Sequence, residues 1–261
     1  MTGLSVVALG VGDAFTARHY SSSLLVECGG ARLLVDCPHP IRRMMRDAGL
    51  RLGEPVDVDG VDAVVITHVH ADHVSGLEGF AYYSHFMLHR RVTLLAHPVV
   101  ATRLWDGHLA AGMDRLLRAS GAPPWPTEEK HFTDYFVHVP LEVTAPVVHG
   151  PFTIECRFTV HHVPTTALRI RAGGACLGYS ADTAFDPGLL DWLTEADLVI
   201  HETNHGVHTP YERLAALPEA LRARLRLIHY PDDFDDAASV IRVLREGERV
   251  AVGPVISARS P

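Results

Sequence analysis

The sequence has few cysteines, no long apolar run and no excess of basic residues. Four cysteines stand among 261 residues and never form a Cys-x-x-Cys pair, so they indicate buried thiols rather than a redox motif. No apolar run approaches the roughly 18 residues that span a bilayer, and we therefore expect no membrane-embedded protein. Asp and Glu outnumber Lys and Arg by 31 to 23, and the net charge of −8 disfavours a broad basic face for nucleic acid.

We also find no signal-peptide pattern, no repeat and no linker. The start, MTGLSVVALGVGDAF, lacks a basic region and a small-residue cleavage site, so it predicts a first strand rather than a signal peptide. From these features we expect a cytoplasmic protein. Without a fixed-period repeat or a long linker, residues 1–261 are predicted to form a single domain.

Apolar patterning predicts alternating strands and helices around a strand-rich segment. Strands are expected where short apolar runs lie between turn residues, at 3–10, 23–27, 31–36, 61–67 and 92–96. Helical spacing and helix-boundary residues predict helices at 40–48, 75–89 and 98–119. Residues 135–180 have a strand-like pattern, and alternation of strands and helices resumes at 187–194, 197–201, 211–224, 225–229, 234–245 and 249–252. This order predicts an α/β protein with mixed sheets and covering helices.

What the sequence has in excess is histidine. Eighteen histidines stand beside 23 Lys and Arg, and four ligand-type residues crowd the segment THVHADH at 67–73. Side chains two apart on extended backbone point the same way, so His68 and His70 are expected to bind one metal ion. Asp72 and His73 follow where the chain turns toward a helix, and we expect them to face a second ion. Imidazole and carboxylate ligands suit zinc and neighbouring divalent metals.

With this motif the sequence resembles a known family. His-x-His-x-Asp-His after an apolar strand resembles the metallo-β-lactamase superfamily, whose members bind one or two metals between two sheets. The resemblance implies a four-layer αββα sandwich with two mixed β-sheets. It also implies two divalent metal ions as cofactors, with Zn²⁺ expected and Mn²⁺ or a similar ion as the alternative.

The same resemblance implies later ligands in the order His, Asp, His. His161 or His162, Asp182 in GYSADT and His229 in RLIHYP follow that order. In the ribonuclease Z branch a ligand His lies eight residues before an Arg of the following strand, and counting back from Arg169 favours His161. Asp182 is expected to bridge both ions, and a turn cap is its structural alternative. For His229 the alternative is a buried or capping histidine.

Three further segments are similar to the phosphodiesterase side of the superfamily, which includes ribonuclease Z. They are LGVGDAF at 9–15, GYSADT at 178–183 and DLVIHETN at 197–204. Carried over from that branch, His201 would protonate or position the leaving oxygen and Glu202 would hold His201 in place. A histidine bound to its own backbone is the structural alternative for His201. Asp72 completes the residues expected in catalysis.

Together these residues predict a dinuclear metal-dependent hydrolase. We expect a phosphodiesterase that acts on a small or cyclic phosphodiester or nucleotide through a hydroxide shared by the two metals. The alternatives are a lactonase or thioesterase of the same superfamily, an RNA 3′-processing nuclease, and a binding protein without activity. Transfer RNA is not expected as a substrate, because the interval between His161 and Asp182 is too short for an RNA-gripping arm. A homodimer is an open alternative to a single chain.

Overall fold

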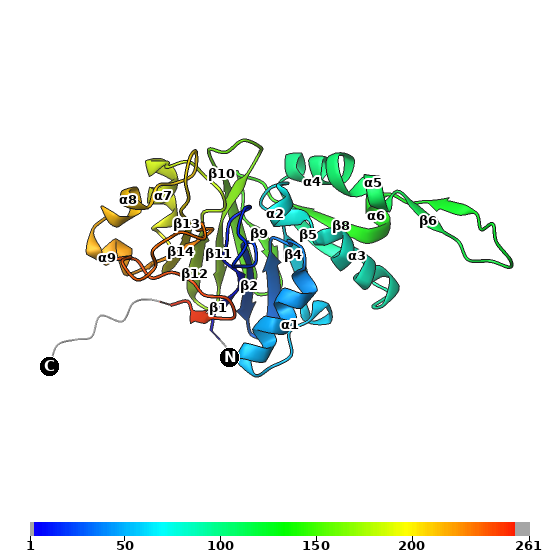
Figure 1. The fold of residues 1–261 in the computed structure, drawn as a ribbon, viewed down its shortest axis with the longest axis horizontal. Coiled ribbons are helices and arrows are strands. Elements are labelled where there is room, and N and C mark those ends of the chain that lie inside the picture. The colour runs from blue at the N-terminus through cyan, green and yellow to red at the C-terminus, as the bar shows by residue number, and fades with distance from the viewer. Residues whose placement is uncertain (1–2, 254–261) are drawn as a thin grey trace.

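Two β-sheets form the centre of the protein, and helices flank them (Figure 1). The computed structural model describes residues 3–253. The first sheet has seven strands in the order β15-β1-β2-β3-β4-β5-β8. These strands are β1 (Ser5–Gly10), β2 (Ser23–Cys28), β3 (Ala31–Val35), β4 (Ala63–Val65), β5 (Val92–Ala96), β8 (Phe136–Pro140) and β15 (Arg249–Ala251).

The second sheet has six strands in the order β14-β13-β12-β11-β10-β9. They are β9 (Val147–His149), β10 (Phe152–Phe158), β11 (Thr166–Ala172), β12 (Ala175–Tyr179), β13 (Leu198–Glu202) and β14 (Leu225–Ile228). Both sheets are mixed, since β1-β2-β3 and β9-β10-β11-β12 pair antiparallel whereas β3-β4-β5-β8 and β12-β13-β14 pair parallel. The predicted sandwich with two mixed sheets is confirmed.

Side-chain alternation along the strands explains how the layers pack. In β1, Val6 and Ala8 belong to the core between the sheets, where they join Phe152 of β10 and Leu168 of β11. The intervening Val7 packs into a second core with the helices on the other face of the first sheet. A strand that is apolar on both faces is typical of a sheet covered on both sides.

Helices cover each sheet on its outer side (Figure 1). Those of the first sheet are η1 (Val58–Gly60), α1 (Ile41–Leu52), α2 (Ala71–Val74), α3 (Leu77–Phe86), α4 (Pro98–Leu104) and α6 (Phe132–Tyr135), and those near the second are α7 (Pro187–Leu193), α8 (Tyr211–Ala215) and α9 (Glu219–Arg222). Within residues 3–253 no helix has the length and apolar character needed to cross a membrane.

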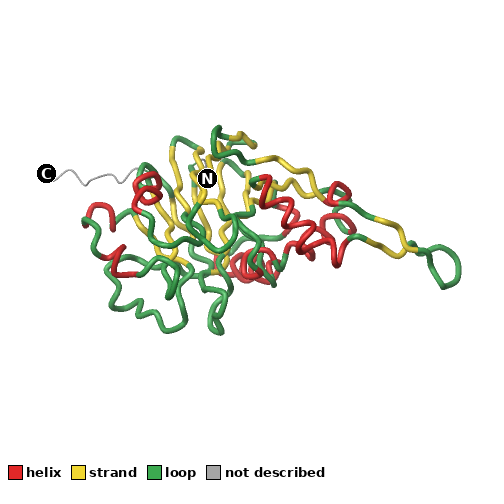
Figure 2. Tube along the Cα trace, turned by 90° about the horizontal axis from the view of Figure 1, so that it is seen from above, coloured by secondary structure: helices red, strands yellow, loops and turns green. Residues whose placement is uncertain are grey.

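The predicted helix 98–119 is wrong after Met113. After α4, a π-helical turn η2 (Trp105–Leu109) and α5 (Ala110–Met113), the chain leaves the helix and enters a hairpin. Strands β6 (Arg115–Leu117) and β7 (Thr127–Glu129) pair antiparallel and project from the body as a long arm (Figures 1 and 2). The apolar spacing at 116–117 misleads because Leu117 is 67% exposed, so it has no core to face.

Three other expectations need correction. The predicted helix 75–89 is shorter, since α3 spans Leu77–Phe86 and is separated from the preceding α2 at Gly76, where a side chain would collide with the Pro38 backbone. The predicted segment 211–224 divides into α8 and α9 at Pro218, which cannot continue a helix. Segment 234–245 contains neither helix nor strand, because local contacts such as the hydrogen bond from the Ala238 N–H to Asp235 Oδ1 hold it in turns.

Candidate metal centre

Seven side chains converge where several strands end. His68 and His70 follow β4, Asp182 follows β12 and His229 follows β14, whereas His161 lies in the connection between β10 and β11. Ligand sites gather at the carboxyl ends of parallel strands because the loops there meet at one edge of the sheet. Asp72 and His73, in α2, complete the set.

The first ligand group contains His68, His70, His161 and Asp182, whose ligand atoms lie within 4.8 Å of one another. Asp182 Oδ2 lies 3.7 Å from His68 Nε2 and 3.8 Å from His161 Nε2. His161 Nε2 lies 3.1 Å from His70 Nδ1. Three imidazoles and one carboxylate are a ligand set that zinc and similar ions accept.

The second group contains Asp72, His73, Asp182 and His229. Asp72 Oδ2 lies 3.3 Å from both His73 Nε2 and His229 Nε2. Asp182 contributes Oδ1 at 3.3 Å from His73 Nε2 and Oδ2 at 3.4 Å from His229 Nε2. Asp182 therefore belongs to both groups, as expected of a carboxylate that bridges two ions.

Buried polar atoms in these groups fit metal ligation. Among residues 3–253, His68 Nε2, His73 Nε2 and Asp182 Oδ1 are buried and have no hydrogen-bond partner. A buried polar atom without a partner costs about 1–3 kcal/mol. His68 Nε2 belongs to the first ligand group, His73 Nε2 to the second and Asp182 to both, so a cation in each group would give these atoms a partner, and the residues present fit a two-metal site.

Neighbouring side chains fix which imidazole nitrogen faces the centre. His73 Nδ1 lies 2.9 Å from Asp36 Oδ2, so it donates to that carboxylate and leaves Nε2 as the ligand atom. The Thr67 hydroxyl lies 3.0 Å from His68 Nδ1 and also donates to Asp36, which leaves His68 Nε2 for a metal. Asp36 and Thr67 thus orient the rings of His68 and His73.

Three non-glycine residues beside the centre have left-handed backbone. Asp36 has φ 60°, Ala181 has φ 50° and His229 has φ 57°. Such conformations cost of order 1–3 kcal/mol each, and they persist where surrounding contacts fix them. Asp36 is held by the Thr67 N–H at 2.9 Å, and the His229 N–H donates to the Val11 carbonyl at 2.8 Å. The fold therefore holds the metal-ligand geometry at the expense of local strain.

Burial and charge together prepare these groups to act as ligands. Burial lowers the pKa of His68 well below its usual value and lowers that of His161 to about 4, so both rings are neutral near pH 7. Burial alone would raise the pKa of Asp182, but His229 and His73 hold it well below its ordinary value. Neutral imidazole and ionised carboxylate are the forms that bind cations. The carboxylates of Asp182 and Asp72 outweigh burial and raise the pKa of His73 and His229, so these two rings would release a proton on metal binding.

His161, rather than His162, joins the ligand group. The His161 side chain is buried among the ligands, whereas His162 is exposed at the next position of the loop. The ring centroids of His162 and His70 are 6.2 Å apart, compared with 4.8 Å for His161 and His70. This placement agrees with the sequence-based preference for His161.

His201 and Glu202 lie on opposite faces of β13, because successive strand residues alternate. The Glu202 carboxylate faces the centre, where Oε2 lies 3.9 Å from His229 Nδ1. His201 Nδ1 instead lies 2.7 Å from the Glu202 carbonyl oxygen, and burial lowers the pKa of His201 to about 4. The role predicted for His201 as a proton donor stays a prediction, and its backbone contact matches the structural alternative.

A further histidine, which the sequence analysis did not single out, faces the centre. His208 Nδ1 lies 2.9 Å from Glu202 Oε1, and its ring centroid lies 5.3 Å from that of His229 and 5.4 Å from that of His161. Although burial acts to lower it, the hydrogen bond with Glu202 raises the pKa of His208. His208 and Glu202 therefore form a pair beside the ligand groups that can hold and deliver a proton.

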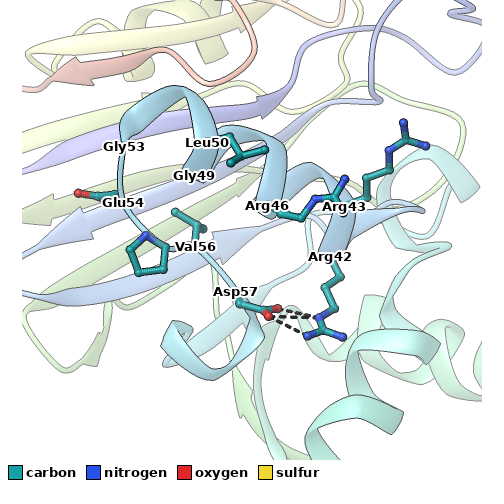
Figure 3. A pocket seen from close by; sticks show the side chains of 10 residues that line it. Arg42, Arg43, Arg46, Gly49, Leu50, Gly53, Glu54, Val56 and Asp57 are labelled. Carbon is teal, nitrogen blue, oxygen red and sulfur yellow. Dashed lines mark hydrogen bonds and ion pairs between the residues drawn. The ribbon is translucent and has the colours of Figure 1, made fainter.

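A cavity of about 740 Å³ lies away from these groups, between α1 and residues 53–57 (Figure 3). Arg42 turns toward Asp57 and places Nη2 2.9 Å from Oδ2, while Arg43 and Arg46 point away from that pair (Figure 3). None of the ligand residues lines this cavity. Its arginines belong to the surface of α1 rather than to the metal centre.

Comparison with known proteins gives the family. The sequence pattern described as "Anti-Pycsar protein Apyc1" matches residues 4–248, nearly the whole chain. This chain belongs to the Apyc1 family. An anti-Pycsar protein Apyc1 of Bacillus phage 010DV004 is 31% identical over 247 residues, covering 89% of this chain and 91% of the relative. The Apyc1 of Paenibacillus xerothermodurans is 28% identical over 240 residues, and the match covers 89% of this chain and 90% of that relative.

Solved structures establish the fold in which this Apyc1 family member is built. The metallo-β-lactamase fold protein YhfI from Bacillus subtilis superposes with a TM-score of 0.73 at 19% identity, covering 96% of this chain and 100% of YhfI. A diphosphatase of the PhnP family superposes with a TM-score of 0.69 at 16% identity, and the match covers 95% of this chain and 97% of the diphosphatase. Unliganded yeast PDE1 superposes with a TM-score of 0.69 at 13% identity, and the match covers 97% of this chain and 100% of PDE1. The resemblance to the metallo-β-lactamase superfamily is thus confirmed at the level of fold.

Two residues of the candidate metal centre, Asp36 and His208, are not among the site residues that the sequence predicts. Asp36 carried a signal, since it ends the run LLVD and directly follows β3. His208 carried little signal in the sequence, because it lies in an irregular loop six residues after Glu202. Other histidines nearby in the sequence do not contact the ligand groups. Only the folded loop shows which of them faces the metal ligands.

Replacing Asp36 tests its orienting role. We expect Asp36→Asn to weaken metal binding about 10–100-fold, because the amide holds the His73 ring less firmly than the carboxylate does. Competition with a coloured chelator measures the affinity. Asp57→Asn, a carboxylate paired with Arg42 on the surface, is the matched control and should bind metal like the parent. Equal affinities in both variants would exclude the orienting role.

Proposed function

We propose that this protein is a metal-dependent phosphodiesterase that hydrolyses a small cyclic nucleotide. The observation that carries the proposal is the position of Asp182, which is common to two His and Asp ligand groups. The family supports the substrate class, since its members are named for acting against Pycsar and this name implies a cyclic nucleotide. A 3′,5′-cyclic nucleotide contains one phosphodiester, which a compact dinuclear site can enclose.

The ligand residues match the demands of phosphodiester hydrolysis. His68, His70 and His161 would hold one ion, Asp72, His73 and His229 the other, and Asp182 both. Two divalent ions bound there would supply positive charge to the phosphodiester and activate the attacking water. That charge also offsets the repulsion between a phosphate and a chain with net charge −8. Zn²⁺ suits the ligands, and Mn²⁺ is the alternative.

His208 is the residue that we propose as proton donor to the leaving oxygen. Its ring lies beside both ligand groups, and its Nδ1 is bound by Glu202, so Nε2 is left to face the substrate. Glu202 is itself fixed by the Thr183 N–H at 2.6 Å. This pairing gives His208 the role that the sequence assigned to His201, with Glu202 as its support.

The other candidate functions find less support. Strands β11 and β12 fill the interval between His161 and Asp182, so an RNA-gripping arm has no place there. The β6–β7 hairpin projects elsewhere, and its charges are mixed, with Arg115 and Arg118 beside Glu128 and Glu129. An RNA grip needs a basic surface. A lactonase or thioesterase would share the same ligands, and only the family favours the phosphodiester.

A panel of substrates tests the proposal. We expect the metal-loaded protein to hydrolyse 3′,5′-cyclic nucleotides with a higher kcat/KM than a lactone, a thioester or a precursor transfer RNA. Bis(p-nitrophenyl) phosphate serves as a phosphodiester without a base. Faster turnover of the lactone or thioester would contradict the phosphodiesterase activity. Faster cleavage of the RNA would support a phosphodiesterase but contradict a cyclic nucleotide as its substrate.

A further inference from the structure

A cavity of about 410 Å³ lies between the loops that follow β13 and β14, and none of the metal-ligand residues lines it. Its walls are the loop that follows β13, from Thr203 onward, and the loop that follows β14, from Pro231 onward. Thr203 directly follows Glu202, and Pro231 is the second residue after His229. The Thr203 N–H donates to the Ile228 carbonyl at 3.1 Å, so the two loops start together at the centre. The volume lies in the range of small-ligand pockets.

Aromatic rings form one wall of this cavity. The Tyr211 and Phe234 rings lie 5.3 Å apart with an interplanar angle of 79°, and Tyr230 extends the group at 5.7 Å from Phe234. The Tyr211 hydroxyl accepts the Val240 N–H at 2.8 Å, which fixes its ring. Rigid aromatic faces favour a flat ligand, because base and aromatic rings stack without a directional requirement.

The polar residues of the cavity indicate which flat ligand fits. Three carboxylates, Glu212, Asp233 and Asp235, line it, and its one histidine, His205, is paired with Asp233 at 3.2 Å. An acidic lining repels a phosphate group. It attracts a neutral ring with N–H donors, since carboxylates accept hydrogen bonds from the amino groups of bases.

The cavity is also held in place by a third loop near the centre. Asn204 Nδ2 donates to Asp13 Oδ2 at 3.0 Å, and Asp232 accepts the Ala17 N–H at 2.8 Å. Residues 13–17 therefore tie both walls to the end of β1. A site fixed before the ligand arrives loses less entropy on binding.

From these observations we propose that the cavity between residues 203–212 and 231–238 binds the nucleobase of the substrate while its phosphodiester lies at the metal centre. This proposal rests on the proposed function and adds a recognition site to it. Phe234 and Tyr211 provide the stacking surface, and the carboxylates accept from the base. A substrate without a base should bind at the metals alone.

Phe234→Ala separates base recognition from hydrolysis. We expect KM for 3′,5′-cyclic nucleotides to rise about 10-fold, as the loss of one stacking partner predicts. The kcat/KM for bis(p-nitrophenyl) phosphate should change less than about 2-fold, because that substrate carries no base. Phe86→Ala, which removes a half-exposed ring from α3, is the matched control and should leave both values unchanged.

Binding of free nucleosides distinguishes failure of this site from failure of the proposed function. Adenosine and cytidine, which carry no phosphate, should shift NMR resonances of the parent and of Phe86→Ala at millimolar concentration. The shifts should disappear in Phe234→Ala with an unchanged Tm. Nucleoside binding without cyclic-nucleotide hydrolysis would support the base site and overturn the proposed activity. An unchanged KM together with no Phe234-dependent binding would overturn the base site alone.

Discussion

Asp182→Ala is expected to lose phosphodiesterase activity by about a thousandfold or more, because one carboxylate serves both ligand groups. Asp182 lies within 3.3–3.8 Å of imidazole nitrogens of His73, His229, His68 and His161. Its removal leaves each group with three ligands and no connection between them. Metal content, measured by elemental analysis after dialysis, should fall together with activity.

The control for this change is His162→Ala, the exposed neighbour of a ligand. It should keep both metal content and activity, whereas His161→Ala should lose metal. Retention of about two metals per chain and full activity by Asp182→Ala would contradict the bridging role. Greater metal loss in His162→Ala than in His161→Ala would assign the ligand role to His162 instead of His161.

His208→Ala is expected to lose rate according to the leaving group. For a 3′,5′-cyclic nucleotide, whose leaving group is an alkoxide, kcat should fall about 100-fold or more, since general acid catalysis contributes roughly that much. For bis(p-nitrophenyl) phosphate the loss should be small, because nitrophenolate departs without a proton. Metal content should stay at the parent level, as His208 contacts Glu202 rather than Asp182.

The matched comparison is His201→Ala, on the opposite face of β13. Its ring contacts the Glu202 carbonyl, so we expect a loss of stability and similar relative rates with both kinds of substrate. A leaving-group-dependent loss in His201→Ala, with none in His208→Ala, would return the role of proton donor to His201. Equal losses for both substrates in His208→Ala would exclude general acid catalysis by that residue.

The sequence could predict those members of the candidate ligand groups whose meeting depends on local geometry. His68, His70, Asp72 and His73 lie within six residues after a buried strand, so their meeting needs only a strand end and one helical turn. Asp182 and His229 are far apart in the chain, and their order within the superfamily pattern carried the prediction. Their position at the ends of β12 and β14 explains why that order is informative.

The features that the sequence did not reveal depend on tertiary contacts. His208 becomes a site residue only because its loop folds back so that the ring meets Glu202. Apolar spacing at 98–119 fits a helix, yet the chain leaves the body after Met113, where no core remains to bury Leu117. A periodic pattern shows which residues share a face but not whether a partner surface exists for that face.

Metal titration of the chelated protein tests the central claim most directly. Zn²⁺ or Mn²⁺ is added in steps, and the initial rate of 3′,5′-cyclic nucleotide hydrolysis is followed at each step. If the two ligand groups around Asp182 form one phosphodiesterase centre, the rate should rise from background and reach its plateau at about two equivalents of metal. A plateau at one equivalent, or full cyclic-nucleotide hydrolysis by the chelated protein, would contradict it.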